Sequence, residues 1–122
     1  MAVAEAKGIQ SEFIPQIATG FCSGIARTGN QCGALSGAIL GISLLTGRQI
    51  PDESVEENYR LTQALINTFV EKFGSTHCPQ LIQVDLASEE GQAEFKAQNK
   101  FTDCLNFAEG ATEITLSLLN NR

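Results

Sequence analysis

The segment between Arg27 and Arg48 carries no charged side chain, and it limits the possible folds more than any other part of the chain. Its dense apolar part, Ala34 to Leu45, is too short to cross a membrane, because a spanning helix needs roughly 20 predominantly apolar residues. Asn30 as N-cap predicts a helix to about Thr46, with Gly47 as the left-handed residue that ends it. A helix with so few polar residues is expected to be buried all round, at the centre of a bundle.

The other segments also carry helical signals, and no Asn-Gly or Asp-Gly hairpin turn is present. A first helix, weakened by Pro15, is expected over residues 4–19, followed by a glycine-rich loop over residues 20–29. Pro51 and a capping box at Ser54 to Glu57 predict a third helix that ends at Gly74. Its apolar stripe has helical spacing and consists of Val55, Tyr59, Thr62, Ile66, Phe69 and Phe73.

Three further helical segments complete the prediction. A short helix begins at Cys78-Pro79, and Ser88 is expected to cap a polar helix that reaches about Asn99. The last helix is expected over residues 101–120. Its stripe consists of Phe101, Cys104, Ala108, Ala111, Thr115 and Leu118. The predicted fold is therefore one all-α domain, residues 1–122, a bundle of four or five helices around a buried glycine-rich helix.

The charge balance excludes two classes of partner. Eight basic and fourteen acidic side chains give a net charge of −6, which disfavours binding to nucleic acid or to an anionic membrane surface. The segment from Met1 to Lys7 contains Glu5 and lacks the apolar region of a signal peptide. A cytoplasmic location without membrane insertion is therefore expected.

Four cysteines, Cys22, Cys32, Cys78 and Cys104, are the candidate functional residues. Because cytosolic thiols are kept reduced, structural disulfides are not expected. The remaining roles are metal or cluster ligation, reversible thiol chemistry and burial as small apolar side chains. Two of the cysteines are predicted to lie at helix starts, Cys32 in a first turn and Cys78 just before Pro79, where free amides favour the thiolate.

Glycine recurs every fourth residue, so that Gly33, Gly37 and Gly41 share one face of the predicted central helix. Each glycine inside a helix costs about 1 kcal/mol relative to alanine, so the row needs a reason. One interpretation is close packing against another helix, within the chain or in a homo-oligomer. The other is space beside Cys32 for a cluster, a metal or a partner's thiol, with Gly33 and Gly37 as its walls.

The string Cys32-Gly33-Ala34-Leu35-Ser36-Gly37, followed by Ala38 and Gly41, resembles the central motif of the redox-active protein family called C_GCAxxG_C_C. The preceding residues 24–27 and the later Cys78 and Cys104 are similar in kind and order. By this resemblance Cys32, Cys78 and Cys104 correspond to the second, third and fourth cysteines of the family. The first family cysteine lies further upstream, where residues 11–14 contain none, so either Cys22 replaces it or Cys22 is an additional thiol.

The resemblance implies redox activity with an iron–sulfur cluster or another metal as one option. Four convergent thiolates would suit zinc, [2Fe–2S] or [4Fe–4S], although no Cys-x-x-Cys pair pre-forms such a site. An exchanging dithiol, an oxidoreductase activity, needs only two sulfurs within bonding reach and a redox partner protein. Both options remain open at this point.

A non-catalytic interaction protein is the alternative from another class, with an oligomeric helical fold in which the glycines and cysteines only pack. Conventional hydrolase or transferase chemistry ranks last, because His77 is the only histidine. The acidic groups at residues 52–57 and 89–90 are explained by helix starts, where the helix dipole favours negative charge.

Overall fold

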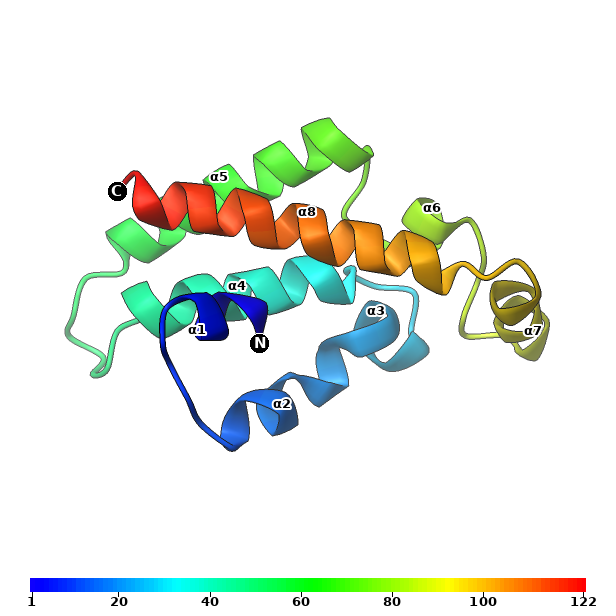
Figure 1. Cartoon of the computed structure of the whole chain (residues 1–122), viewed down its shortest axis with the longest axis horizontal. Coiled ribbons are helices and arrows are strands. Elements are labelled where there is room, and N and C mark those ends of the chain that lie inside the picture. Colours follow the sequence, from blue (N-terminus) through cyan, green and yellow to red (C-terminus); the bar gives the residue numbers. More distant parts are fainter.

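A computed structural model describes all 122 residues, and they form helices without a β-sheet (Figure 1). The helices are α1 (Ala2–Ala6), α2 (Phe13–Ala18), the 3₁₀ turn η1 (Thr19–Phe21), α3 (Cys22–Arg27), α4 (Gly33–Thr46), α5 (Glu56–Phe73), α6 (Cys78–Ile82), α7 (Glu89–Ala97) and α8 (Phe101–Asn120). The predicted all-α fold is confirmed. No helix is both long enough and apolar enough to cross a membrane.

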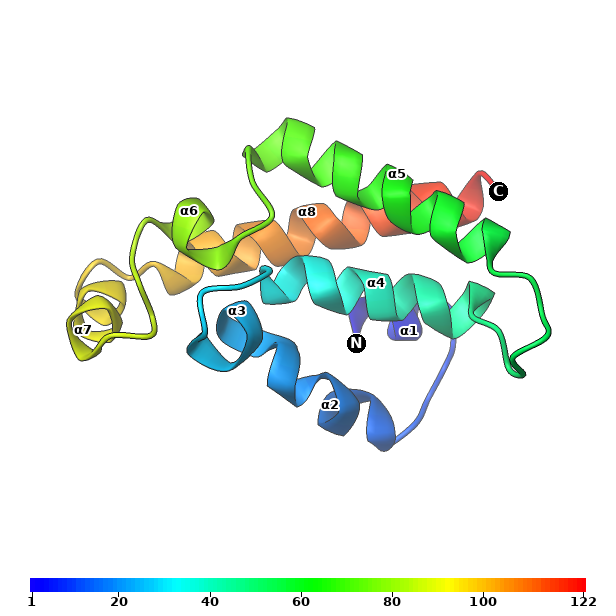
Figure 2. The ribbon, with the colours of Figure 1, turned by 180° about the vertical axis from the view of Figure 1, so that it is seen from behind.

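The three longest helices, α4, α5 and α8, pack against one another along their lengths (Figures 1 and 2). Their buried faces form one continuous apolar core, which also includes side chains from α1 and α6. The largest fully buried apolar side chains are Leu35, Ile42, Leu61, Leu65, Phe69 and Ile82. The short helices α2, α3, α6 and α7 lie around one end and one side of this core.

Helix α4 begins at Gly33 with Cys32 as its N-cap, so the prediction that Asn30 caps it is wrong. The polar groups of Asn30 are used elsewhere. Its N–H donates to the Gly24 carbonyl and its carbonyl accepts from the Cys78 N–H, both at 2.9 Å. The Cys32 carbonyl instead accepts the first helical bond, from the Ser36 N–H at 3.0 Å.

The C-terminal end of α4 also differs from the prediction, because Gly47 is extended (φ −69°, ψ 148°) and not left-handed. Glycine is required there for a different reason. A Cβ atom at this position would lie only 2.5 Å from the Ser43 carbonyl oxygen. Gly47 therefore permits a close backbone approach and not a left-handed turn.

The prediction that α4 is buried all round is wrong, because Gly37 and Leu44 are exposed. Two segments cover its glycine face only in part: η1 and the start of α3 lie over Gly33, and Val3 of α1 lies over Gly41. Between these two segments lies Gly37, where a Cβ atom added to the residue would have no other atom within 4 Å. An apolar groove of about 390 Å³ runs there between α4, α1 and α2.

The start of α5 shows that the predicted capping box does not form. Val55 is the N-cap, and Ser54 Oγ accepts a hydrogen bond from the Glu56 N–H at 3.2 Å. The carboxylate of Glu57 does not return to the backbone, since it pairs with Arg122 at 3.1 Å. The end of the helix agrees with the prediction, because Gly74 is left-handed (φ 92°).

The buried face of α5 is rotated from the predicted stripe. Leu61, Leu65 and Phe69 are its buried residues, whereas Tyr59 is 54% exposed. In α8 the buried residues are likewise Phe107, Gly110, Ala111, Thr115 and Leu119, and Phe101 and Ala108 are exposed. Helix α5 packs against α4 and α8, and α8 packs against α1, α4 and α5, so the arc that is buried follows the bundle and not the strongest local period.

The N-terminal helix predicted over residues 4–19 is instead two short helices, α1 and α2. Gly8 is left-handed (φ 71°) directly after α1, and a connecting segment precedes α2. At the other side of the molecule the predicted Ser88 cap is confirmed, since Ser88 Oγ accepts from the Gly91 N–H at 2.9 Å. Helix α8 has the predicted bounds.

Candidate functional site

A single antiparallel β-bridge between Gln31 and His77 joins the start of α4 to the start of α6. Cys32 N–H donates to the Thr76 carbonyl at 2.8 Å, and Cys78 N–H donates to the Asn30 carbonyl at 2.9 Å. Because side chains alternate along extended backbone, Gln31 and His77 point to one side of the bridge. Cys32 and Cys78 therefore point together to the other side, as diagonal neighbours. Both are buried, each with 8% of its surface exposed.

A left-handed turn covers Cys78 from the other direction. The residues predicted as a loop over 20–29 form η1 and α3, and within α3 all residues from Ser23 to Arg27 have positive φ. Non-glycine residues pay roughly 1–2 kcal/mol each for this conformation. The turn is held by the Gly24 carbonyl, which accepts from the Asn30 N–H. It brings Gly24 so close to Cys78 that an added Cβ would lie 2.6 Å from the Cys78 Cβ.

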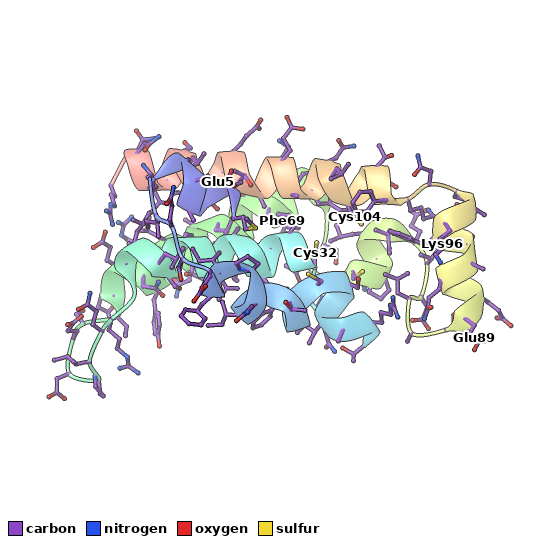
Figure 3. The ribbon with its side chains drawn as sticks, turned by 60° about the horizontal axis from the view of Figure 1, so that its bottom comes forward. Glu5, Cys32, Phe69, Glu89, Lys96 and Cys104 are labelled. Atoms are coloured by element: carbon purple, nitrogen blue, oxygen red, sulfur yellow. The ribbon has the colours of Figure 1, made fainter.

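All four cysteines line one pocket of about 490 Å³, although they come from four different parts of the chain. Cys22 begins α3 and is exposed, and Cys104 lies half-buried in the first turns of α8. Figure 3 shows Cys32 and Cys104 close together between α4 and α8. The other lining side chains include Arg27, Leu81, Ile82, Leu86, Gln92, Phe95, Lys96, Phe101 and Phe107. All four sulfurs are free thiols.

The electrostatics of the buried thiols differ from the prediction at Cys78. Burial, followed by negative charge on Cys32 and then on Cys104, raises the pKa of Cys78 to about 11. Burial likewise raises the pKa of Cys104, followed by the charges of Cys32 and Asp103. The predicted thiolate at Cys78 is therefore wrong, because α6 has only five residues and desolvation outweighs the effect of its N-terminus. Both residues are neutral thiols at pH 7.

Cys32 is the common neighbour of Cys78 and Cys104, because its negative charge raises the pKa of both. Cys22 is outside this group: its sulfur lies 4.0 Å from the Ala18 carbonyl oxygen, within its own turn of chain. The structure thus divides the four candidate cysteines into three interacting thiols and one exposed thiol at the same pocket.

The arrangement does not fit a metal ion or an iron–sulfur cluster as it stands. No three cysteine, histidine, aspartate or glutamate side chains lie close enough together to hold a metal. His77 Nδ1 lies 3.0 Å from Thr76 Oγ1, and its ring is on the opposite side of the bridge from the thiols.

Of the two glycines predicted as site walls, only Gly33 lines the four-cysteine pocket, and Gly33 also reaches the groove beside Gly37. Gly33 lines the four-cysteine pocket, where an added Cβ would lie 3.0 Å from the Phe21 carbonyl oxygen. Gly37 lines the other groove, against α1 and α2. Lys96 and Phe95 of α7 also line the pocket, and no sequence pattern predicted them there, because their place depends on how α7 folds back beside α6.

With this geometry the comparison with other proteins is informative. The chain belongs to the family described as "Putative redox-active protein (C_GCAxxG_C_C)", which matches residues 1–118. An uncharacterized protein of Archaeoglobus fulgidus is 33% identical over 132 aligned residues, which cover 100% of this chain and 82% of that protein. No solved structure matches the chain. The resemblance inferred from the motif at Cys32 is therefore confirmed.

Proposed function

We propose that the protein is a thiol–disulfide oxidoreductase in which Cys32 and Cys78 form the exchanging pair. The observation that carries this proposal is the Gln31–His77 bridge, which directs both buried side chains into one pocket. Membership of a redox-active family supports redox chemistry in general. Diagonal neighbours lie roughly 7–8 Å apart, just outside the roughly 4.4–6.8 Å between Cα atoms that a disulfide needs, so the two segments must move closer for the bond to form.

The proposed reaction exchanges one disulfide for another. The Cys32 sulfur, as thiolate, attacks one sulfur of a partner disulfide, the partner's S–S bond breaks, and one partner thiol leaves. Cys78 then loses its proton and attacks the Cys32 sulfur of the mixed disulfide, which releases the second partner thiol. Two protein thiols are oxidised to one disulfide while one partner disulfide is reduced to two thiols, so electrons and protons balance.

The second attack limits the rate in this scheme. Burial raises the pKa of Cys78 to about 11, so that only a small fraction is thiolate at neutral pH. His77 lies on the other side of the bridge and is not placed to take the proton. Cys104 adds a third thiol next to Cys32, and Cys22 adds an exposed thiol at the pocket. Four free thiols suit a reducing compartment such as the cytoplasm.

Thiol titration of serine variants tests the proposal. The reduced protein, treated with hydroxyethyl disulfide, is expected to lose two titratable thiols and to recover them with a reductant. Cys32→Ser is expected to abolish the reversible loss, and the matched variant Cys104→Ser is expected to retain it. The assignment of Cys32 would be contradicted if Cys32→Ser still lost two thiols reversibly. It would also be contradicted if the reversible loss disappeared in Cys104→Ser and persisted in Cys32→Ser.

A second candidate function, assembly of identical helical subunits, is favoured by the open groove beside Gly37. Ile17 at this groove is 69% exposed, and Leu44 opposite it is also exposed. Exposed apolar side chains around a groove are typical of interaction sites. Light scattering with size exclusion tests it: a dimer that Ile17→Glu converts to a monomer supports assembly, and a monomeric wild-type protein excludes it.

A further inference from the structure

The four-cysteine pocket has a charge pattern opposite to that of the whole chain. The protein has fourteen acidic and eight basic side chains. The 18 residues that line the pocket nevertheless include two cations, Arg27 and Lys96, and no carboxylate. Neither cation is neutralised by an ion pair, because the only salt bridge joins Arg122 to Glu57. The lining of the pocket is therefore positive on an acidic protein, and Asp103 is a carboxylate outside the lining whose charge also acts on Cys104.

Its interior is mostly apolar, with 12 hydrophobic residues among the 18. Three phenylalanines lie in its wall: Phe95 from α7, and Phe101 and Phe107 from α8. Phe107 is buried, whereas Phe101 is 58% exposed, so the aromatic wall reaches from the core to the surface. A volume of about 490 Å³ is within the range of small-molecule sites, roughly 300–1,000 Å³.

We propose that this pocket binds a small organic anion, with its apolar body among the phenylalanines and its acidic group near Arg27 and Lys96. The two cations come from two different helices, α3 and α7, and Figure 3 shows Lys96 on the side of α7 that faces the bundle. An apolar enclosure with a few placed charges is the usual design of a small-ligand site. A purely apolar ligand would leave both cations without a partner.

The thiols give this ligand a chemical role. Cys32 and Cys78 are almost inaccessible from the surface, so a reactant reaches them through the pocket. An acidic organic disulfide in the pocket would present its S–S bond to Cys32 and leave as two thiols when the Cys32–Cys78 disulfide forms. This role rests on the proposed function, whereas binding of the anion depends only on the shape and charge of the pocket.

Two fluorescent probes of the same shape test the binding. 8-Anilinonaphthalene-1-sulfonate has an aromatic body and one negative charge, and N-phenyl-1-naphthylamine has the same body without the charge. Titration of the reduced protein is expected to show one site that binds the sulfonate more tightly. Arg27→Glu and Lys96→Glu are each expected to weaken sulfonate binding on the order of tenfold and to leave the neutral probe unchanged. Arg60→Glu, an exposed cation of α5 outside the pocket, is the control.

A pair of apolar variants locates the probe. Phe101→Ala is expected to weaken the binding of both probes. Ile17→Ala, at another exposed apolar side chain, in the groove beside Gly37, is expected to change neither affinity. Equal affinity for the two probes would overturn the proposal. So would a loss of sulfonate affinity in Arg60→Glu as large as in Arg27→Glu and Lys96→Glu, or a loss of probe affinity in Ile17→Ala that is absent in Phe101→Ala. Because the titration needs no redox step, its result is independent of the Cys32→Ser experiment: probe binding without thiol exchange contradicts only the proposed function.

Discussion

At the scale of single residues, Cys78 shows how position in the core outweighs position in a helix. It is the first residue of α6, where free amides favour an anion, yet burial raises its pKa to about 11. A five-residue helix has too few aligned peptide dipoles to offset desolvation. A buried thiol in this state is protected from unspecific oxidation and reacts only after its proton is removed.

The first prediction concerns the alkylation of Cys78. Because thiolate is the reactive form, its rate with iodoacetamide is expected to rise about tenfold per pH unit up to pH about 11. Peptide mass spectrometry of the native protein measures the rate at each pH, with the exposed Cys22 as the internal reference that reacts first. A plateau of the Cys78 rate near pH 9 would show that burial does not raise its pKa.

The second prediction concerns the left-handed turn above Cys78. Gly24→Ala is expected to destabilise the protein by about 1–3 kcal/mol more than Gly8→Ala. Gly24 and Gly8 have positive φ, 67° and 71°, so both substitutions place alanine in the unfavourable left-handed backbone conformation. Only at Gly24 would the new Cβ meet another side chain, that of Cys78, whereas Gly8 has open space. Urea unfolding measures the difference, and equal losses at the two positions would contradict the close contact.

At the scale of elements, the glycine face of α4 serves different purposes along its length. At Gly33 the backbone of η1 and α3 lies against the helix, which brings Cys22 to the pocket. At Gly41 Val3 of α1 fills the space, and at Gly37 the face is open. Close packing therefore explains two of the three glycines, and the third lines a groove.

The third prediction follows from this difference. Gly37→Ala is expected to stabilise the protein by about 0.5–1 kcal/mol, because alanine is the better helix former and the added methyl group meets nothing. Gly33→Ala is expected to destabilise it, since the methyl group would lie 3.0 Å from the Phe21 carbonyl oxygen and 3.2 Å from the Cys22 Cα. Thermal unfolding of the two variants compares them. A lower unfolding temperature for Gly37→Ala would mean that another chain fills the groove.

Helix boundaries show which local signals were sufficient. Ser88 caps the start of α7 and Gly74 ends α5, both as predicted from neighbouring residues alone. Asn30 could not cap α4, since its carbonyl accepts from the Cys78 N–H of α6 and its N–H donates to the Gly24 carbonyl of α3. The bridge to α6 joins residues distant in sequence. Long-range pairing of this kind is not visible in local propensity.

At the scale of the whole molecule, the sequence predicted the helical class and the family. It did not predict which faces of α5 and α8 are buried, because the neighbouring helices determine each face. It also did not predict Lys96 and Phe95 in the pocket, since their position depends on the return of α7 beside the core. The motif at Cys32 was informative because it encodes a close backbone contact at Gly33 together with a thiol.

The fourth prediction concerns the stability of the whole fold at alkaline pH. The folded state holds the Cys78 proton up to pH about 11, whereas the unfolded thiol ionises near pH 9.0. The stabilisation is therefore fully present below pH 9 and is lost as the pH rises towards 11. The free energy of unfolding in urea is expected to fall across this interval, and less steeply in Cys78→Ala. Identical pH profiles for the two proteins would contradict the link to Cys78.

The central claim is that Cys32 and Cys78 form a reversible disulfide, and disulfide mapping after anaerobic purification tests it most directly. Iron, zinc and free thiols are counted first on the reduced protein, which is then oxidised by hydroxyethyl disulfide, digested and analysed by mass spectrometry. We predict a linked peptide pair that contains Cys32 and Cys78, absent before oxidation and absent again after reduction, in protein without stoichiometric metal. Stoichiometric iron or zinc bound by the thiols, or an oxidised protein in which Cys32 remains free, would contradict the claim.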